Sequence, residues 1–301
     1  MDGNTRGRLR HDAATGGQHM TATEAARAID EAIGRGLHET GNLGAEIAFR
    51  VSPQGQPGSA ASVSESGRCH RRRFLDAIGS APTEPVTPEE LLGFATGHAI
   101  EAIVISALQA AGVEVSWPCG SKRSHSDPPD VVIHVAACRP AIAGHVDALA
   151  AIDGASVVVE VKATNEVRFE RVRLGDGTEG DEAQAMLYAW ALRAGYIAEP
   201  AKGFDGSAVV GAVVVYVNRG ARRGLRGWVV LPVEIDDDAV TDLIDGYASV
   251  AAWVAHHRET GELMPIPEDM APHRFPCATA GERGTTTWCP HYSTCWRSMR
   301  I

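Results

Sequence analysis

The stretch "GHVDALAAIDGASVVVEVKAT", residues 144–164, decides the fold of this 301-residue chain. The Asp-Gly pair at 153–154 is typical of a two-residue type I′ turn, in which both central residues need a positive φ. Strands folded about this turn bring Asp147 directly opposite Glu160. Like charges that face each other across a strand pair destabilise it. The two carboxylates therefore need an explanation beyond the packing of the strands.

The alternation of residues along the two predicted strands, 142–152 and 155–162, separates an apolar face from a charged one. The apolar face is expected to meet the core and carries Val146, Ala148, Ala150, Ile152, Ala155, Val157, Val159 and Val161. The other face carries His145, Asp147, Leu149, Glu160 and Lys162.

Two carboxylates placed across a strand pair either share a proton or hold a cation between them. Hard oxygen ligands are the ones that Mg²⁺ and Mn²⁺ prefer. Lys162 would lie at the edge of such an ion, where its amine can orient or deprotonate a water molecule, or offset charge on a phosphate. The alternative is a solvent-facing hairpin with a surface pair of Glu160 and Lys162 and an incidental Asp147.

The remaining pattern predicts an α/β fold with a mixed central β-sheet flanked by helices. Residues 1–62 are expected to form a poorly ordered or helical extension, with one helix near 21–37, and residues 63–301 the main domain. Its predicted helices are 88–111, a segment from Asp181 that Gly195 stops, and 236–259. Its further predicted strands are 113–117, 130–136, 208–218 and 227–235.

Composition limits the classes of function. The formal charge of −10 argues against a protein that coats nucleic acid indiscriminately. There is neither an apolar run long enough to span a membrane nor the apolar middle of a secretion signal, so a cytoplasmic location and no membrane contact are expected. Nucleic acid would have to meet two local basic patches, whose arginines are Arg68, Arg71, Arg72, Arg73, Arg222 and Arg223. Each patch taken alone is equally compatible with a solvated loop.

Three motifs resemble one nuclease family. Asp147 followed by "EVK" at 160–162 resembles the core of the PD-(D/E)XK nucleases. "QAMLY", from Gln184 to Tyr188, resembles the QxxxY motif of the RecB-like branch, and "GFATGHAIEAI" at 93–103 resembles its first motif, a Gly-x-x-His helix. Each motif also has a structural alternative: a helix cap for Gln184, ordinary core for Tyr188, and an exposed or structural role for the motif's histidine.

The resemblance implies a restriction-endonuclease-like core and a metal-dependent DNA exonuclease that acts on single-stranded DNA or DNA ends. The implied ligands of Mg²⁺ or Mn²⁺ are His98, Asp147, Glu160 and the carbonyl of Val161, with Glu101 a weaker candidate. Lys162 would act on the nucleophile, while Gln184 and Tyr188 would hold the substrate strand or the water. The implied setting is DNA repair, recombination, phage replication or CRISPR adaptation, with a protein partner from one of these processes. The alternative is a non-catalytic module that binds DNA or docks a partner.

Cysteine usage points to a metal, because a cytosolic chain seldom forms disulfides. Cys69 far upstream, with Cys277, Cys289 and Cys295 near the end, resembles the iron–sulfur layout of the CRISPR-adaptation RecB-like nucleases and their phage relatives. That resemblance implies a cluster, [4Fe-4S] before [2Fe-2S], which staples both ends around the core. A local Zn²⁺ site of Cys277, Cys289, His291 and Cys295 is the alternative. Cys119 and Cys138 lie outside this pattern and are expected to be buried.

Overall fold

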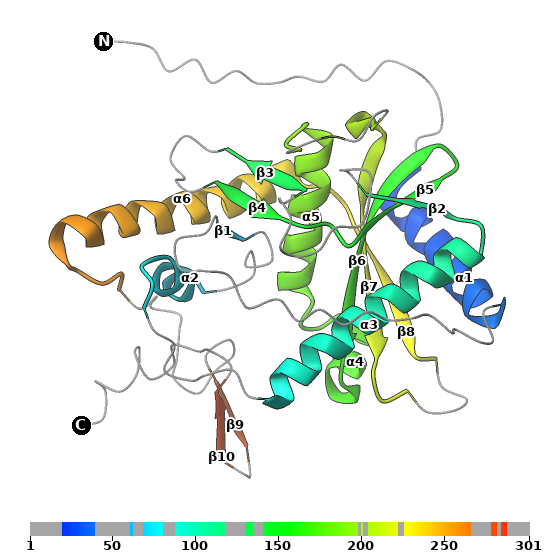
Figure 1. Cartoon of the computed structure of the whole chain (residues 1–301), viewed down its shortest axis with the longest axis horizontal. Coiled ribbons are helices and arrows are strands. Elements are labelled where there is room, and N and C mark those ends of the chain that lie inside the picture. The colour runs from blue at the N-terminus through cyan, green and yellow to red at the C-terminus, as the bar shows by residue number, and fades with distance from the viewer. Residues whose placement is uncertain are drawn as a thin grey trace.

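A mixed five-stranded sheet of order β2-β5-β6-β7-β8 forms the centre of the computed structural model, as Figure 1 shows. Its strands are β2 (Glu114–Ser116), β5 (Ala148–Ile152), β6 (Ala155–Thr164), β7 (Val209–Asn218) and β8 (Trp228–Val233). β6 and β7 are parallel and the other neighbours are antiparallel. The structure describes residues 20–39, 61–62, 69–80, 88–117, 130–134, 141–197, 200, 204–221, 226–265, 278–281 and 284–287.

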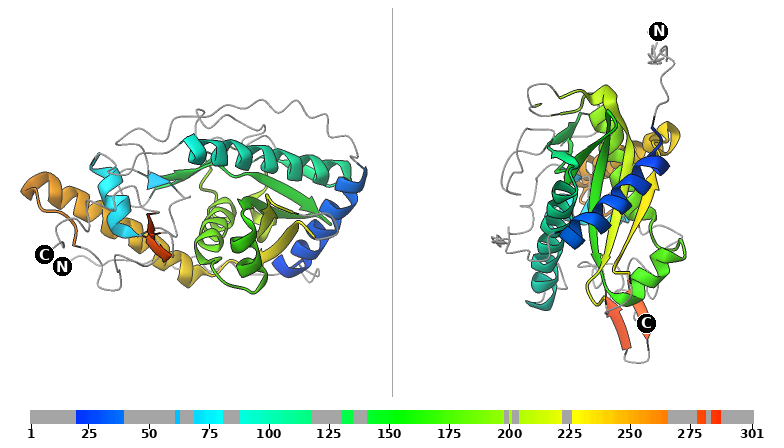
Figure 2. Two further views of the ribbon diagram at one scale, coloured as in Figure 1. Left: turned by 90° about the horizontal axis from the view of Figure 1, so that it is seen from below. Right: turned by 90° about the vertical axis from the view of Figure 1, so that its right-hand side faces the viewer.

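Helices cover both faces of this sheet, which confirms the predicted α/β class. α1 (Ala22–Glu39) and α3 (Pro88–Ala110) lie on one face, and α4 (Glu166–Arg173) and α5 (Glu179–Arg193) on the other. The right-hand view of Figure 2 shows α3 and α4 on opposite sides of the strands. The long helix α6 (Asp237–Thr260) extends away from the sheet, and α2 (His70–Ala77) packs against it. None of the described helices is long and apolar enough to cross a bilayer.

Smaller elements surround the central sheet. β4 (Ile142–Gly144) lies between β1 (Ala61–Ser62) and β3 (Val131–Ile133) in a second sheet. The 3-10 turn η2 (Gly206–Ala208) leads into β7, and β9 (Ala278–Gly281) pairs with β10 (Gly284–Thr287) as a hairpin.

The turn at 153–154 forms as predicted. Asp153 has a φ of 49° and Gly154 a φ of 83°, and the register of β5 on β6 pairs Ile152 with Ala155. The predicted apolar face is confirmed, because Ala148, Ala150, Val157 and Val159 lie in one core cluster. The face that carries Glu160 and Lys162 is also covered, however, so the hairpin is packed on both sides. Val157 and Val159 pack toward α1 and α3, whereas Val158 belongs to the core cluster under α5.

The predicted strand 142–152 is also wrong, because it is broken at 145–147 into β4 and β5, which belong to different sheets. Side chains take the backbone groups that a continuous strand would use for its ladder. The Val146 N–H donates to Asp130 Oδ2 at 3.2 Å, and Trp117 Nε1 donates to the Asp147 carbonyl at 2.8 Å. Val146 consequently packs in the cluster beneath α5 and not beside Ala148.

α1 contributes to the same core as the sheet. Thr21 and Glu24 form a capping box at its start, which explains the predicted helix near 21–37. Its buried residues include Ile29 and Ile33, which pack with α3 and the strands. At Gly36 the two helices approach so closely that an added Cβ would lie 1.8 Å from the Ala107 carbonyl oxygen. The contact between α1 and α3 therefore depends on a residue without a side chain.

Gly36→Ala is expected to lower the free energy of unfolding by about 1–3 kcal/mol or more, because the methyl group meets backbone that cannot move aside. Thermal melting should show this as a loss of about 2–4 °C for each kcal/mol. Gly97→Ala in α3 is the control, because nothing lies within 4 Å of its added Cβ. The free energy of unfolding of that variant should be unchanged or higher by about 0.5–1 kcal/mol. Equal melting of both variants would contradict the close approach.

Candidate functional site

The predicted residues Glu160, Lys162 and Gln184 form a closed triangle of hydrogen bonds between β6 and α5. Glu160 Oε1 accepts from Lys162 Nζ at 2.7 Å and from Gln184 Nε2 at 2.8 Å. Lys162 Nζ also donates to Gln184 Oε1 at 2.8 Å. Gln184 is therefore not a cap residue, and α5 in fact begins two residues before Asp181, after Thr178.

Asp147 lies beside this triangle, in the break between β4 and β5. Its Oδ2 accepts from the Val161 backbone N–H at 2.8 Å, one residue beyond Glu160. In an extended strand the N–H and C=O of one residue face the same neighbour. The Val161 carbonyl is thus directed to the side on which Asp147 lies. Both carboxylates and this carbonyl meet at one edge of β6.

The site holds more negative charge than its one lysine neutralises. Burial raises the pKa of Asp147 well above its usual range, and the charges of Glu160 and Glu101 raise it further. Burial also raises the pKa of Glu160, against the opposing effect of Lys162. Glu160 Oε2 is buried and has no hydrogen-bond partner. Hard oxygen donors with uncompensated charge, one of them free, fit a divalent cation.

Lys162 carries the positive charge of the site. Burial alone would lower its pKa, but the carboxylates of Glu160, Asp181 and Asp147 outweigh that effect and raise it. A lysine held in its charged form can orient a water molecule and offset charge on a phosphate. It is poorly suited to accept a proton.

The predicted ligand His98 contacts Glu101 on the same helix, α3. Its Nδ1 lies 3.6 Å from Glu101 Oε2, and its side chain is 42% exposed against 11% for Glu101. Glu101 is the α3 residue whose charge reaches Asp147 and Glu160. Within the described ranges, no three His, Cys, Asp or Glu side chains already surround one point as metal ligands do.

Tyr188 lies beneath the site and not on its surface. It is 2% exposed, and burial together with Glu160 and Asp147 raises the pKa of its hydroxyl well above the usual range. An added Cβ on Gly144 would lie 2.5 Å from that hydroxyl oxygen, so only glycine fits there. The expected contact of Tyr188 with a substrate strand does not match this depth. Gly144 was missed, although it stands three residues before Asp147 in the quoted stretch.

The first basic patch is largely part of the core. Arg71 is 7% and Arg73 5% exposed, and the Arg73 guanidinium stacks 4.3 Å from the centre of the Tyr247 ring. The phosphate contact expected of these two arginines is therefore not supported, because both side chains are buried. Arg72 lies beside Asp76, with 3.8 Å between Nε and Oδ2.

Several predicted residues lie outside the described part of the chain: Arg68, Arg222, Arg223, Cys277, Cys289 and Cys295. The described cysteine, Cys69, has a half-buried free thiol and directly precedes α2. In sequence, Cys277 directly precedes β9 and Cys289 follows β10 by two residues. The proposed cluster thus remains a prediction.

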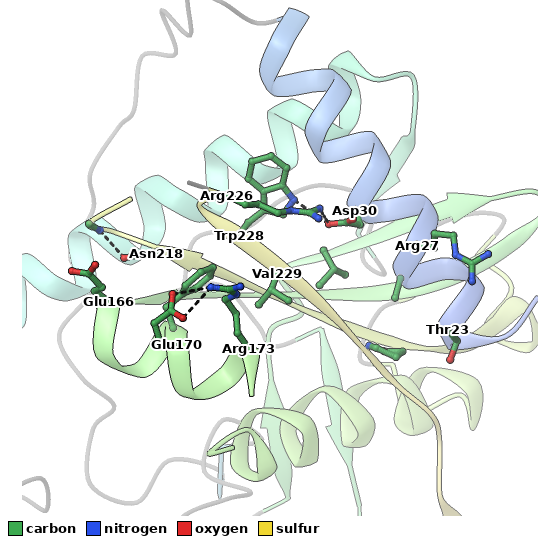
Figure 3. A pocket seen from close by; sticks show the side chains of 15 residues that line it. Thr23, Arg27, Asp30, Glu166, Glu170, Arg173, Asn218, Arg226, Trp228 and Val229 are labelled. Atoms are coloured by element: carbon green, nitrogen blue, oxygen red, sulfur yellow. Dashed lines mark hydrogen bonds and ion pairs between the residues drawn. The ribbon is translucent and has the colours of Figure 1, made fainter. Parts of the chain in front are cut away.

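A separate pocket of about 580 Å³ lies between α1, α4 and β8, as Figure 3 shows. Four of its charged side chains form two ion pairs: Arg226 contacts Asp30, and Arg173 contacts Glu170. None of the predicted site residues that the structure describes lines it. Paired charges of both signs make this pocket a weak candidate for an anionic substrate.

Neither a protein-family profile nor a curated protein sequence matches the chain. Among solved structures, the chain is similar to LHK-Exo in complex with dAMP, with a TM-score of 0.42 and 12% identity over 68% of this chain and 95% of that one. It is also similar to the alkaline exonuclease LHK-Exo from Laribacter hongkongensis, with a TM-score of 0.36 and 12% identity over 66% and 90%. We base the function on the contacts of the site itself.

The raised carboxyl pKa values predict that, without divalent cations, stability falls as pH rises. Above the ordinary values of 3.8 for Asp147 and 4.5 for Glu160, the unfolded chain releases protons that the folded chain still holds. The free energy of unfolding is therefore lost as pH rises through the raised native values. Lys162 does not contribute here, because its contribution is lost only above 10.5.

Asp147→Asn should flatten this dependence, measured by urea unfolding in EDTA between about pH 5 and about pH 8. Added Mn²⁺ should stabilise the unmodified chain, by about 2.7 kcal/mol at a hundredfold excess over its Kd. Asp153→Asn is the control, because it removes a carboxylate from the same hairpin and keeps the turn. Equal pH slopes for the two variants would contradict the charge excess.

Proposed function

We propose that this protein is a metal-dependent DNA exonuclease that acts on single-stranded DNA or DNA ends. One observation supports this most: a buried carboxylate, Glu160, and a half-buried one, Asp147, lie beside a charged lysine, with an oxygen of Glu160 left free. A purely structural ion pair would need one carboxylate, and the second adds repulsion in a buried place. A divalent cation removes that repulsion.

The proposed ligands of Mg²⁺ or Mn²⁺ are Asp147, Glu160, the Val161 carbonyl and His98, with Glu101 between His98 and the other carboxylates. When bound, such an ion lowers the pKa of a water molecule and stabilises charge on the phosphodiester. The chain's own residues orient the reactants. Gln184 holds the Glu160 carboxylate and the Lys162 ammonium in fixed positions through its amide.

Lys162 directs its ammonium to the place where negative charge develops on the phosphate. Because Glu160 and Gln184 already fix its position, it loses little entropy in the transition state. Tyr188 fills the space below and, against Gly144, holds the loop that carries Asp147. Its proposed role is thus to position the carboxylates.

We also propose the iron–sulfur cluster, with Cys69, Cys277, Cys289 and Cys295 as ligands and with [4Fe-4S] favoured over [2Fe-2S] or Zn²⁺. The half-buried free thiol of Cys69 at the start of α2 supports this proposal. The cluster would join that helix to the C-terminal segment. Its role would be structural, with ligation supplying folding free energy.

Asp147→Asn and Lys162→Ala are each expected to lower cleavage of end-labelled single-stranded DNA by about 10²–10⁴-fold, because each removes a charge that acts on the reacting phosphate. Asp147→Asn should melt no lower than the unmodified chain in EDTA, since it relieves repulsion. Asp153→Asn should cleave normally, and EDTA should stop all cleavage. Normal turnover by either site variant would remove the assignment. DNA binding by the unmodified chain without cleavage would favour the alternative, a non-catalytic DNA-binding module.

Protein purified without oxygen is expected to be brown, and Cys289→Ser should lose the colour and melt at a lower temperature. Cys138→Ala should keep the colour, because that residue lies outside the pattern. Iron and sulfide content and the visible spectrum check the expectation. Colourless protein that contains Zn²⁺ would overturn the iron–sulfur proposal and leave the nuclease proposal intact.

A further inference from the structure

A chain of three polar side chains runs from the core to the surface next to Lys162. Tyr216 on β7 is the strand neighbour of Lys162 and is fully buried. Its hydroxyl donates to Asp181 Oδ2 at 2.9 Å, and Arg168 Nη2 donates to the same oxygen. The chain ends in a guanidinium whose side chain is 47% exposed.

This arrangement differs from the other ion pairs of α4. Arg171 with Asp176, and Arg173 with Glu170, join partners that are each more than half exposed. Such pairs contribute little and fix neither side chain. The Asp181 side chain is only 15% exposed, and a core hydroxyl holds its oxygen. Asp181, which the Tyr216 hydroxyl holds in turn, therefore fixes the position of the Arg168 guanidinium.

The helix that carries Arg168 is fixed as well. Asn165 caps α4 by accepting the Arg168 backbone N–H at 2.9 Å. Phe169 and Val172 are buried in the core beneath α5. A guanidinium has five N–H donors, and one carboxylate oxygen does not use them all. Arg168 can bind a second anion without leaving Asp181.

The charges around Arg168 bear on how an anion would approach the site. Asp181 accepts from Tyr216, the β7 neighbour of Lys162, so this carboxylate lies near the proposed metal site. The first turn of α5 carries Glu179, Asp181 and Glu182, which repel an anion from that helix end. Arg168 supplies the opposite charge beside them, on the side of the site where Lys162 lies.

We propose that Arg168 binds a phosphate of the DNA strand adjacent to the phosphodiester that is cleaved, and that Asp181 and Tyr216 are positioning residues for its guanidinium. This inference rests on the proposed nuclease function. The planar fork of arginine suits a phosphate, which it contacts through two N–H groups at once. The fixed fork sets the register of the strand relative to Lys162.

The test measures the affinity for a single-stranded oligonucleotide, in the cleavage-deficient Asp147→Asn background, at several salt concentrations. Adding Arg168→Gln should weaken binding about tenfold, as expected for loss of a hydrogen bond to a charged group. It should also reduce the salt slope by about 0.7, the value for one phosphate contact on a single strand. Arg171→Gln on the same helix is the matched control and should change neither quantity.

Two further variants separate positioning from charge and protect the test against misfolding. Arg168→Lys keeps the charge but loses the fork, so binding should weaken while the salt slope is kept. Tyr216→Phe changes no charge and should weaken binding less than Arg168→Gln does. In the chain with intact Asp147, both should raise KM more than they lower kcat.

The outcomes distinguish the two proposals. If the intact chain cleaves DNA but Arg168→Gln and Arg168→Lys bind like Arg171→Gln, the phosphate contact is wrong and the nuclease function stands. If the intact chain neither binds nor cleaves DNA, the nuclease function is wrong and this inference fails with it.

Discussion

The placement of two carboxylates, Glu160 buried and Asp147 half-buried, beside one ammonium is the constraint on which the site depends. Glu160 lies in the middle of a sheet that is packed on both faces, so water cannot solvate its charge. Lys162 and Gln184 satisfy one of its oxygens and leave the other without a partner. Asp147 then brings a second negative charge to the same edge, held there by the Val161 N–H. A fold selected for stability alone would replace such a group by an apolar one of similar size. The cost of this arrangement supports the proposal that a divalent cation binds here.

The broken strand is part of the same constraint. A continuous strand through 142–152 would use the backbone groups of residues 145–147 in a ladder, and Asp147 would stand in a regular pair opposite Glu160. Asp130 and Trp117 instead take the Val146 N–H and the Asp147 carbonyl, which ends β4 and starts β5 anew. The break frees the Asp147 carboxylate to turn along β6 and accept from Val161. Asp130 and Trp117, which are distant in sequence, thus determine the position of the Asp147 carboxylate more than a regular strand through 142–152 would.

This explains which features the sequence could predict. The turn at 153–154 follows from local backbone chemistry, and the helices with clear caps or stops form close to where they are expected. The meeting of Glu160, Lys162 and Gln184 follows from a two-residue strand period and a motif on a helix. The break at 145–147 could not be predicted in this way, because its cause lies in residues up to 30 positions away. The depth of Tyr188 likewise depends on Gly144, whose lack of a side chain has no periodic signal. The Asn165 cap of α4, in contrast, was a local signal that could have predicted that short helix.

The buried and exposed arginines show how tertiary contacts decide what a basic residue does. Arg71 and Arg73 stand in the most basic run of the chain, yet both are buried, and Arg73 packs on the ring of Tyr247 in α6. Arg168 stands in a mixed-charge helix that attracts no notice in the sequence, yet it presents a fixed guanidinium to solvent. The arginines differ in their partners. Asp181, which accepts from a buried hydroxyl, holds the Arg168 guanidinium at the surface. The Arg73 guanidinium instead packs on the ring of Tyr247 and is buried. Arg168 thereby presents a positive charge to solvent on the α4 side of the carboxylates, and a phosphate chain that meets the proposed ion would be expected to pass it.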